Sequence, residues 1–307
     1  MYMSRHHAAW KPGSSSSHAN HAAGGGNTPP PPVALITGGS SGIGLCLAKL
    51  FAERGFALTL AARSLPSLEA ASADVRAAGQ HHRPPPTVTV ASVDVADVDA
   101  CGRLVTGAAE QHGQLDVLVV CAGVGHHGLC TADDPGLATH RRMMDINYMG
   151  AVGCIQSALP ILLAAQPTGR ILAVGSLSGE VGLPVRSAYC ASKAALSAYL
   201  ESISRELAMQ GTPIAITNVA PSSVDTNFHG KSQRHGPRPS LSAEQCATCT
   251  MAAFDAGKSI SFIPGYMRLL PLLPRWLSDP AIASQQRSLL GGVTAAEHER
   301  ELTRARL

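Results

Sequence analysis

The stretch that most constrains the fold is Val33 to Gly44, which reads Val-Ala-Leu-Ile-Thr-Gly-Gly-Ser-Ser-Gly-Ile-Gly. Its first four residues are apolar, which is typical of a buried parallel strand. Gly38, Gly42 and Gly44 follow, and an apolar pattern of helical spacing begins at Ile43. A strand, a glycine turn and a helix in this order can hold the pyrophosphate of a dinucleotide. The glycines let the backbone approach it, and the helix N-terminus offers free N–H groups.

The remainder of the chain repeats this alternation of strand and helix. Strands are predicted at Val33–Ile36, Ala57–Ala61, Thr87–Val93, Val117–Val120, Ile171–Val174, Ile214–Val219 and Ile260–Ile263. Helices are predicted at Leu65–Ala78, Asp97–His112, Leu137–Ala165, with a bend at Pro160, and Ala188–Met209. The alternation predicts an α/β fold of the Rossmann-like, doubly wound type. It would have a parallel sheet of about seven strands with helices on both faces.

The predicted domain covers residues 33–277, because the composition changes at both of its ends. Residues 1–32 are rich in Ser, Gly, His and Pro, so they are predicted to be a disordered tail. Residues 278–307 are predicted to be a helical or flexible tail. Hydrophobic residues make up 45% of the chain and charged residues 15%, which is enough to build one large core.

Charge, apolar segments and cysteines exclude several other classes of protein. The formal net charge of +3 is too small to indicate a nucleic-acid partner. Ser259–Leu277 is apolar but contains three prolines and two arginines, so no transmembrane segment is expected there. It is predicted to be a last strand and a short amphipathic segment, with a peripheral membrane contact left open. Cys246 and Cys249 lack the second pair that zinc prefers, so no metal is expected. They are predicted to be thiols on a helix face, with a redox pair as the alternative.

Tyr189 and Lys193 are the first candidates for chemistry. They are four residues apart at the start of a predicted helix, so both side chains lie on one helix face. Ser176 directly follows the fifth predicted strand. Ligands of a parallel sheet bind beyond the carboxyl ends of its strands, so these three side chains are predicted to converge near the dinucleotide turn.

Together these motifs resemble the short-chain dehydrogenase/reductase family over roughly residues 33–263. The motifs that agree in order are Thr37 to Gly44, Asp94-Val95, Cys121-Ala122-Gly123, Asn147, Ser176, Tyr189-xxx-Lys193 and Pro221 to Thr226. The resemblance implies a catalytic tetrad of Asn147, Ser176, Tyr189 and Lys193. It implies cofactor contacts from Thr37, Gly38, Ser40, Ser41, Gly42, Ile43, Gly44, Asp94, Val95, Cys121, Ala122, Gly123, Tyr189, Lys193, Pro221, Val224 and Thr226. Asp94 and Val95 would flank the adenine, and Val224 and Thr226 would lie near the nicotinamide carboxamide.

The chemistry of these side chains suits the implied roles. Free tyrosine has a pKa of about 10, and a nearby lysine ammonium and an oxidised nicotinamide both favour its phenolate. Tyr189 is therefore expected to act as general acid in reduction and general base in oxidation. Ser176 would donate a hydrogen bond to the carbonyl oxygen, where charge develops. Lys193 would also bind the ribose, and Asn147 would hold a water that relays protons from Lys193.

Four positions bear on cofactor choice and local geometry. Arg63 ends the second predicted strand, where an NAD enzyme usually places a carboxylate for the ribose. A guanidinium there suits a 2′-phosphate, so NADP(H) is predicted as the cofactor, with NAD(H) less favoured. The family usually has asparagine at Cys121, a second serine at Gly175 and glycine at Ser222. These departures predict altered local geometry and the same reaction.

The substrate is only weakly marked. His126 and His127 follow the fourth strand, where they either meet a polar substrate group or face water. Residues 228–241 have the composition of a lid, and Met267–Leu273 is apolar. The resulting hypothesis is an NADP(H)-dependent enzyme that interconverts a carbonyl and a secondary alcohol on a hydrophobic or lipid-like small molecule. Two alternatives stay open: a non-catalytic NADP-binding regulatory protein, and an epimerase or dehydratase on the same fold.

The oligomeric state and the cellular location can also be predicted. The resemblance implies a homodimer or homotetramer formed through the Leu137 and Ala188 helices. The last residues, Ala305-Arg306-Leu307, resemble the small–basic–leucine variants of the C-terminal peroxisomal signal. They predict binding to the peroxisomal import receptor, with a cytoplasmic location as the alternative.

Overall fold

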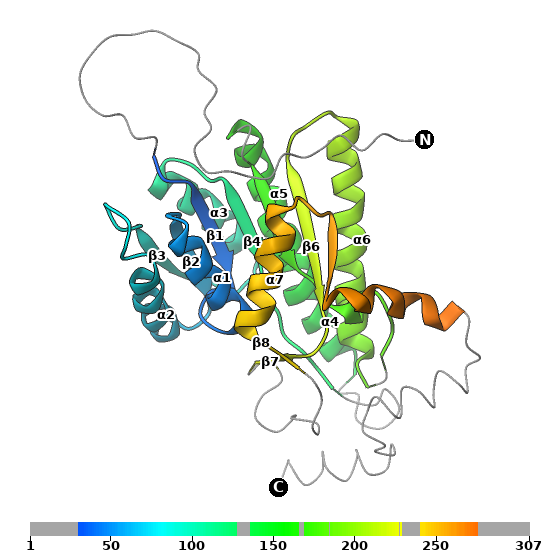
Figure 1. The fold of residues 1–307 in the computed structure, drawn as a ribbon. Coiled ribbons are helices and arrows are strands. Elements are labelled where there is room, and N and C mark those ends of the chain that lie inside the picture. Colours follow the sequence, from blue (N-terminus) through cyan, green and yellow to red (C-terminus); the bar gives the residue numbers. More distant parts are fainter. Residues whose placement is uncertain are drawn as a thin grey trace, which may run out of the picture.

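The protein is a doubly wound α/β domain (Figure 1), seen in a computed structural model that describes residues 30–127, 136–165, 169–183, 185–226, 228 and 240–275. Its main sheet is parallel and has seven strands in the order β3-β2-β1-β4-β5-β6-β9. The strand order reverses between β1 and β4, and a crevice at the carboxyl ends of the strands is expected at such a reversal.

The elements follow the predicted alternation closely. The strands of the main sheet are β1 (Val33–Thr37), β2 (Ala57–Ala62), β3 (Val88–Ser92), β4 (Val117–Val120), β5 (Arg170–Val174), β6 (Ala215–Pro221) and β9 (Ile260–Ile263). A second, two-stranded sheet pairs β7 (Val224–Asp225) with β8 (Leu241–Ser242). The helices are α1 (Gly42–Glu53), α2 (Leu65–Ala78), α3 (Val98–His112), α4 (Leu137–Met144), α5 (Gly150–Ala164), α6 (Ser187–Met209) and α7 (Ala243–Asp255). Shorter turns are η1 (Asp145–Met149), η2 (Leu177–Gly179) and η5 (Gly265–Arg275).

The helices form a layer on each face of the sheet, and each layer has its own core. The helices α1, α2 and α7 share one apolar cluster with the sheet, and α3, α5 and α6 share the other. Phe51 packs edge-on against Phe56 and Phe254, with ring centroids 5.0 Å and 5.7 Å apart. The rings of Phe51 and Phe254 join α1 to α7. The other buried residues of both cores are aliphatic, apart from Phe56, Cys101, Cys154 and Met251.

The long helix predicted over Leu137–Ala165 is interrupted, but at a different place from the one expected. Pro160 lies inside α5 without ending it. The irregularity is the π-helical turn η1, which joins α4 to α5 and contains the buried side chain of Asn147. A π-turn inserts an extra residue into the helical repeat, and such turns are frequent at functional sites.

The same helical stretch bears on a possible membrane contact. Among the described residues, Leu137–Ala164 is long and apolar enough to cross a membrane, and 50% of its most apolar window is buried inside the fold. A helix in the core of a globular protein can be equally apolar and equally buried.

Cys246 and Cys249 lie in α7 as free thiols, one buried and one exposed. Residues 1–29 and 278–307 of the predicted tails, which include Ala305–Leu307, and most of residues 228–241 lie outside the described residues. The expectations about them stay predictions.

Candidate active site

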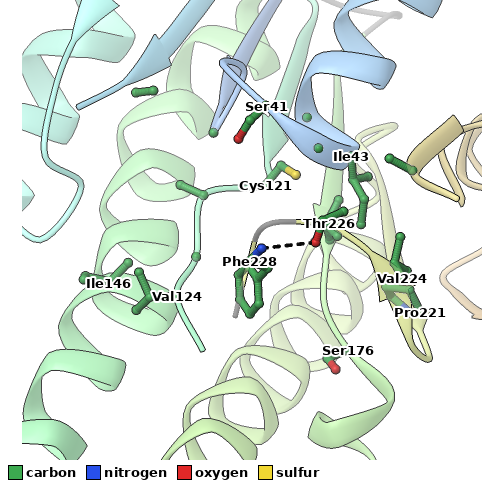
Figure 2. A pocket seen from close by; sticks show the side chains of 18 of the residues that line it. Ser41, Ile43, Cys121, Val124, Ile146, Ser176, Pro221, Val224, Thr226 and Phe228 are labelled. Carbon is green, nitrogen blue, oxygen red and sulfur yellow. Dashed lines mark hydrogen bonds between the residues drawn. The ribbon is translucent and has the colours of Figure 1, made fainter. Parts of the chain in front are cut away.

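A cavity of about 1130 Å³ opens at the carboxyl ends of the central strands (Figure 2). Its walls come from the turn after β1, the ends of β2, β3 and β4, the start of α6 and the segment after β6. The lining includes Gly38, Ser40, Ser41, Gly42, Ile43, Gly44, Arg63, Asp94, Val95, Cys121, Ala122, Gly123, Ser176, Tyr189, Lys193, Pro221, Val224 and Thr226. The fold therefore brings nearly all of the predicted site residues to one cavity.

The glycine turn packs so closely against neighbouring backbone that side chains at Gly38 and Gly44 would not fit. Gly38 has φ +70°, and a Cβ there would lie 2.9 Å from the backbone of Ala122. A Cβ on Gly44 would lie only 2.2 Å from the carbonyl oxygen of Gly38. The turn is a bare backbone cradle followed at once by the N-terminus of α1, and these are the features that suit a pyrophosphate. The residues present therefore fit a dinucleotide.

Arg63 and Asp94 border the same cavity from the neighbouring strand ends. Arg63 is exposed, and its carbonyl oxygen accepts a 2.9 Å hydrogen bond from the hydroxyl of Ser92. The carboxylate of Asp94 accepts a 3.1 Å bond from the N–H of Ala96. A cationic side chain, Arg63, thus follows β2, and an anionic one, Asp94, follows β3. The carboxylate that many NAD enzymes place at the end of β2 is absent from that position.

Tyr189 and Ser176 both line the cavity. Tyr189 is only 6% exposed. Burial raises the pKa of Tyr189, while the hydroxyl of Ser176 and the charge of Arg186 act in the opposite direction. Burial is the larger influence because the phenolate loses its hydration. Burial thus raises the tyrosine pKa in the chain without a cofactor, and the expected lowering by Lys193 together with an oxidised nicotinamide stays a prediction.

Lys193 is buried beside this pair. Its ammonium donates a 2.9 Å hydrogen bond to the carbonyl oxygen of Val174, at the end of β5. Burial lowers the pKa of Lys193 to about 8. The charged lysine is thus costly in the folded chain, and a polar ligand or a charge partner in the cavity would favour its protonated form.

Two predicted residues, Thr37 and Asn147, shape the cavity from outside its lining. The hydroxyl of Thr37 accepts hydrogen bonds from the N–H groups of Cys121 and Ala122, at 3.1 and 3.3 Å. Asn147 clamps Val124: its Oδ1 accepts from the Val124 N–H at 2.8 Å, and its Nδ2 donates to the Val124 carbonyl at 2.9 Å. Both side chains fix the path of the loop that follows β4.

Several site residues were missed by the sequence analysis. Arg186 and Phe228 line the cavity, and the Phe228 ring lies 5.9 Å from the Tyr189 ring, edge to face. The N–H of Phe228 donates to the hydroxyl of Thr226, as the dashed line in Figure 2 shows. Ser192 accepts a 3.0 Å hydrogen bond from Asn147 and donates to the carbonyl of Tyr189. The sequence offered two signals: the position of Arg186, three residues before the tyrosine, and the lid-like composition of the stretch that begins at Phe228.

For the two histidines, the structure decides one of the open alternatives. His127 is 4% exposed and lines the cavity, so it does not face bulk water. His126 is only partly buried and is not part of the lining. His127 is therefore part of the cavity wall, and His126 is not.

The departures from the family pattern have local explanations. A Cβ on Gly175 would lie 2.5 Å from Oδ1 of Asn218, so the space of a serine side chain there is already filled. Burial raises the pKa of the Cys121 thiol to about 11, and the nearby Lys193 lowers it only in part. The thiol is therefore protonated at neutral pH, and Thr37 holds the adjoining backbone in place.

Comparison with known proteins agrees with this site. The family model described as short chain dehydrogenase matches residues 32–236, so the chain belongs to the short-chain dehydrogenase/reductase family. Dehydrogenase/reductase SDR family member 7B of Mus musculus is 32% identical over 196 residues, which cover 63% of this chain and 58% of the relative. 11-beta-hydroxysteroid dehydrogenase A of Sesamum indicum is 35% identical, over 66% of this chain and 56% of the relative. The chain thus spans less than two thirds of the length of these relatives.

Solved structures show the same fold at low sequence identity. A short chain dehydrogenase/reductase from Burkholderia phymatum, in complex with NAD, matches with a TM-score of 0.68 and 24% identity. The match covers 83% of this chain and 95% of that one. An alcohol dehydrogenase from the archaeon Thermococcus sibiricus, complexed with 5-hydroxy-NADP, matches with a TM-score of 0.64 and 24% identity, over 73% and 90%. The Rossmann-type architecture predicted from the sequence is confirmed.

Proposed function

We propose that the protein is an NADP(H)-dependent oxidoreductase that interconverts a carbonyl and a secondary alcohol. The observation that carries this proposal is that Tyr189, Ser176 and Lys193 line the same cavity as the glycine cradle, with Tyr189 and Lys193 buried. A regulatory nucleotide-binding protein has no need of a buried acid–base pair at this place. Nothing in the described site favours an epimerase or dehydratase.

In the direction of reduction, a bound nicotinamide supplies the hydride. Ser176 donates a hydrogen bond to the carbonyl oxygen, and Tyr189 gives that oxygen its phenolic proton as negative charge develops there. In oxidation, the phenolate of Tyr189 takes the proton back from the alcohol. The carbonyl of Val174 holds Lys193 in the wall of the same cavity, where its ammonium favours the phenolate.

The proposed preference for NADP(H) depends on Arg63. This side chain is exposed at the cavity border where β2 ends, and the adjoining residues Ala62 and Ser64 carry no negative charge. A guanidinium can hold a 2′-phosphate through two parallel hydrogen bonds. Ser40 and Ser41 line the same part of the cavity and can add hydroxyl groups.

The substrate is proposed to be apolar around its carbonyl, and lipid-like. Val124, Ile146 and Phe228 contribute apolar surface to the cavity close to the Tyr189 ring. One relative is named for an 11-beta-hydroxysteroid, which is a secondary alcohol on an apolar skeleton. This name supports an apolar substrate class.

A homodimer or homotetramer is also proposed, through α4, α5 and α6. Large apolar side chains stand out on this side: Leu137 is 81% exposed and Met149 is 39% exposed. Covering such apolar side chains with a partner subunit removes them from water, which favours association. Light scattering of the purified protein tests this, and a monomer at micromolar concentration would contradict it.

A panel of ketones and secondary alcohols, followed by NADPH absorbance, tests the proposed reaction. We expect NADPH to be consumed with at least one ketone and NADP⁺ to be reduced with the matching alcohol. Substrate conversion without net change in the cofactor would favour an epimerase or dehydratase. Cofactor binding without turnover of any compound would favour a regulatory protein.

A further inference from the structure

The hydroxyl of Ser176, in the cavity wall (Figure 2), is held by the turn that follows it. Ser176 is the N-cap residue of η2, and its oxygen accepts a 3.1 Å hydrogen bond from the N–H of Ser178. Because a hydroxyl oxygen accepts as well as donates, this contact leaves the single hydrogen of Ser176 for donation elsewhere. The place from which Ser176 donates therefore depends on where η2 lies.

The turn η2 packs against helix α6 at Lys193. A Cβ on Gly179, the last residue of η2, would lie 2.8 Å from the carbonyl oxygen of Lys193 and 2.9 Å from its carbonyl carbon. The turn and the helix therefore touch backbone to backbone, with no room for a larger residue. The ammonium of Lys193 also donates to the carbonyl of Val174, two residues before Ser176. The end of β5, the turn η2 and the helix α6 thus meet at one place.

A side-chain bridge ties η2 to α6 one helical turn beyond Lys193. Ser197 follows Tyr189 and Lys193 at intervals of four residues, so all three lie on one face of the helix. The hydroxyl of Ser197 donates a 2.6 Å hydrogen bond to the carboxylate of Glu180, the residue directly after η2. The oxygen of Ser197 accepts a 3.2 Å bond from the side-chain amide of Asn218 in β6. Glu180 is thereby tied to the helix and, through Ser197, to the sheet.

The bond between Ser197 and Glu180 is a strong one for its place. Both side chains are partly buried, and a hydroxyl that donates to a carboxylate forms a shorter and stronger bond than one between neutral groups. The pKa of Tyr189 is shifted mainly by burial, by Ser176 and by Arg186. We therefore expect Glu180 to influence the site through position and not through its charge.

We propose that Glu180 and Ser197 are positioning residues, which hold the Ser176 hydroxyl where it and Tyr189 reach the same carbonyl oxygen. The proposal rests on the proposed function. Ser176 follows β5 and Tyr189 belongs to α6, so the distance between them depends on how these elements are joined. Without the bridge, η2 can shift away from the helix. A misplacement of about 1 Å can cost about a hundredfold in rate, so a smaller shift is expected to cost about tenfold.

The variants Ser197→Ala and Glu180→Ala each remove the bridge. In ketone reduction with NADPH, we expect kcat to fall about tenfold in either variant. The KM for the ketone, and the NADPH affinity in a fluorescence titration, should stay within a few-fold of wild type. Ser197→Thr keeps a hydroxyl and Glu180→Gln keeps an acceptor oxygen, so both should recover most of kcat. Ser202→Ala, an exposed serine of the same helix, is the matched control and should behave as the wild type does.

A double-mutant cycle separates positioning of Ser176 from a general loss of structure. In a Ser176→Ala background, Ser197→Ala should cause no further loss of kcat, because the hydroxyl that it positions is already gone. The pH dependence of kcat should keep its wild-type shape in Glu180→Ala. If Ser197→Ala does not fold, Glu180→Ala, which lies outside the helix, takes its place in the cycle.

Three results would overturn this inference and leave the proposed reaction standing. These are wild-type kcat in both alanine variants, a further tenfold loss in the Ser176→Ala background, and a shifted pH profile in Glu180→Ala. A loss of NADPH affinity as large as the loss of kcat would also overturn it, because the damage would then extend to the cofactor end. A wild type that turns over no ketone or alcohol of the panel would overturn the proposed function as well.

Discussion

The two ends of the cavity are built by different means. The end that borders the glycine cradle is made of backbone: Gly38 and Gly44 leave no room for a Cβ, and Thr37 holds neighbouring N–H groups. The end around Tyr189 is made of side chains from separate elements, including Phe228 and Arg186. A site for a common cofactor can be fixed by backbone shape, while selection among substrates depends on side chains that differ from protein to protein.

The two ends are joined by Asn147. Its side chain fixes both the N–H and the carbonyl of Val124, which lies in the loop after β4, and it also bonds Ser192 in α6. The π-turn η1 places this side chain in the interior. In the structure Asn147 is thus a positioning residue between the two ends, and the predicted water relay from Lys193 stays a prediction.

The end of the cavity that is built from backbone is tested most directly by a substitution at Gly44. In Gly44→Ala the new Cβ would press on the carbonyl of Gly38, so the turn must shift. Overpacking of this kind costs about 1–3 kcal/mol, and we expect cofactor affinity to fall about tenfold or more in a fluorescence titration. Gly107→Ala in α3 is the control, because nothing lies within 4 Å of its Cβ and alanine favours the helix by up to about 1 kcal/mol. Unchanged cofactor binding by Gly44→Ala would contradict a backbone cradle.

The cofactor preference is tested at Arg63. The wild type should bind NADPH more tightly than NADH, and Arg63→Asp should narrow or reverse this preference. The substitution removes the partner of the phosphate and adds a like charge, for which a change of about tenfold is expected. Arg103→Asp, an exposed position on α3, controls for the altered net charge. A wild type that prefers NADH would show that Arg63 is only a surface residue.

A smaller effect is expected from the buried charge of Lys193. Its pKa is about 8 in the folded chain and near its ordinary value of 10.5 when unfolded. Between these pH values the unfolded chain holds a proton that the folded chain has lost, so the free energy of unfolding should rise with pH. The slope is at most about 1.4 kcal/mol per pH unit. Cys121 and Tyr189 are shifted in the opposite direction, so the measured quantity is the difference between wild type and Lys193→Met. If the difference in unfolding free energy between wild type and Lys193→Met does not change between pH 8 and 10, Lys193 is not buried as a costly charge.

The cofactor end could be predicted well from the sequence, and the substrate end could not. Glycine spacing and apolar strands are local patterns, and strands of a parallel sheet bring their ends together wherever the chain folds this way. The contact of Phe228 with Tyr189 joins two distant segments, and no local pattern indicates it. The displacement of a serine at Gly175 by Asn218 depends on the packing of β5 against β6. The burial that raises the pKa of Tyr189 depends on the residues packed around it, and residue spacing does not show that burial.

Turnover of Tyr189→Phe tests the central claim most directly. We expect the rate of ketone reduction to fall at least about a hundredfold, because the general acid is lost, while NADPH affinity stays within a few-fold of wild type. Tyr199→Phe, a partly buried tyrosine on the same helix that packs against Tyr148, should keep nearly full activity. A Tyr189→Phe variant that reduces ketones at a rate close to wild type would show that the proton comes from elsewhere and that the proposed mechanism is wrong.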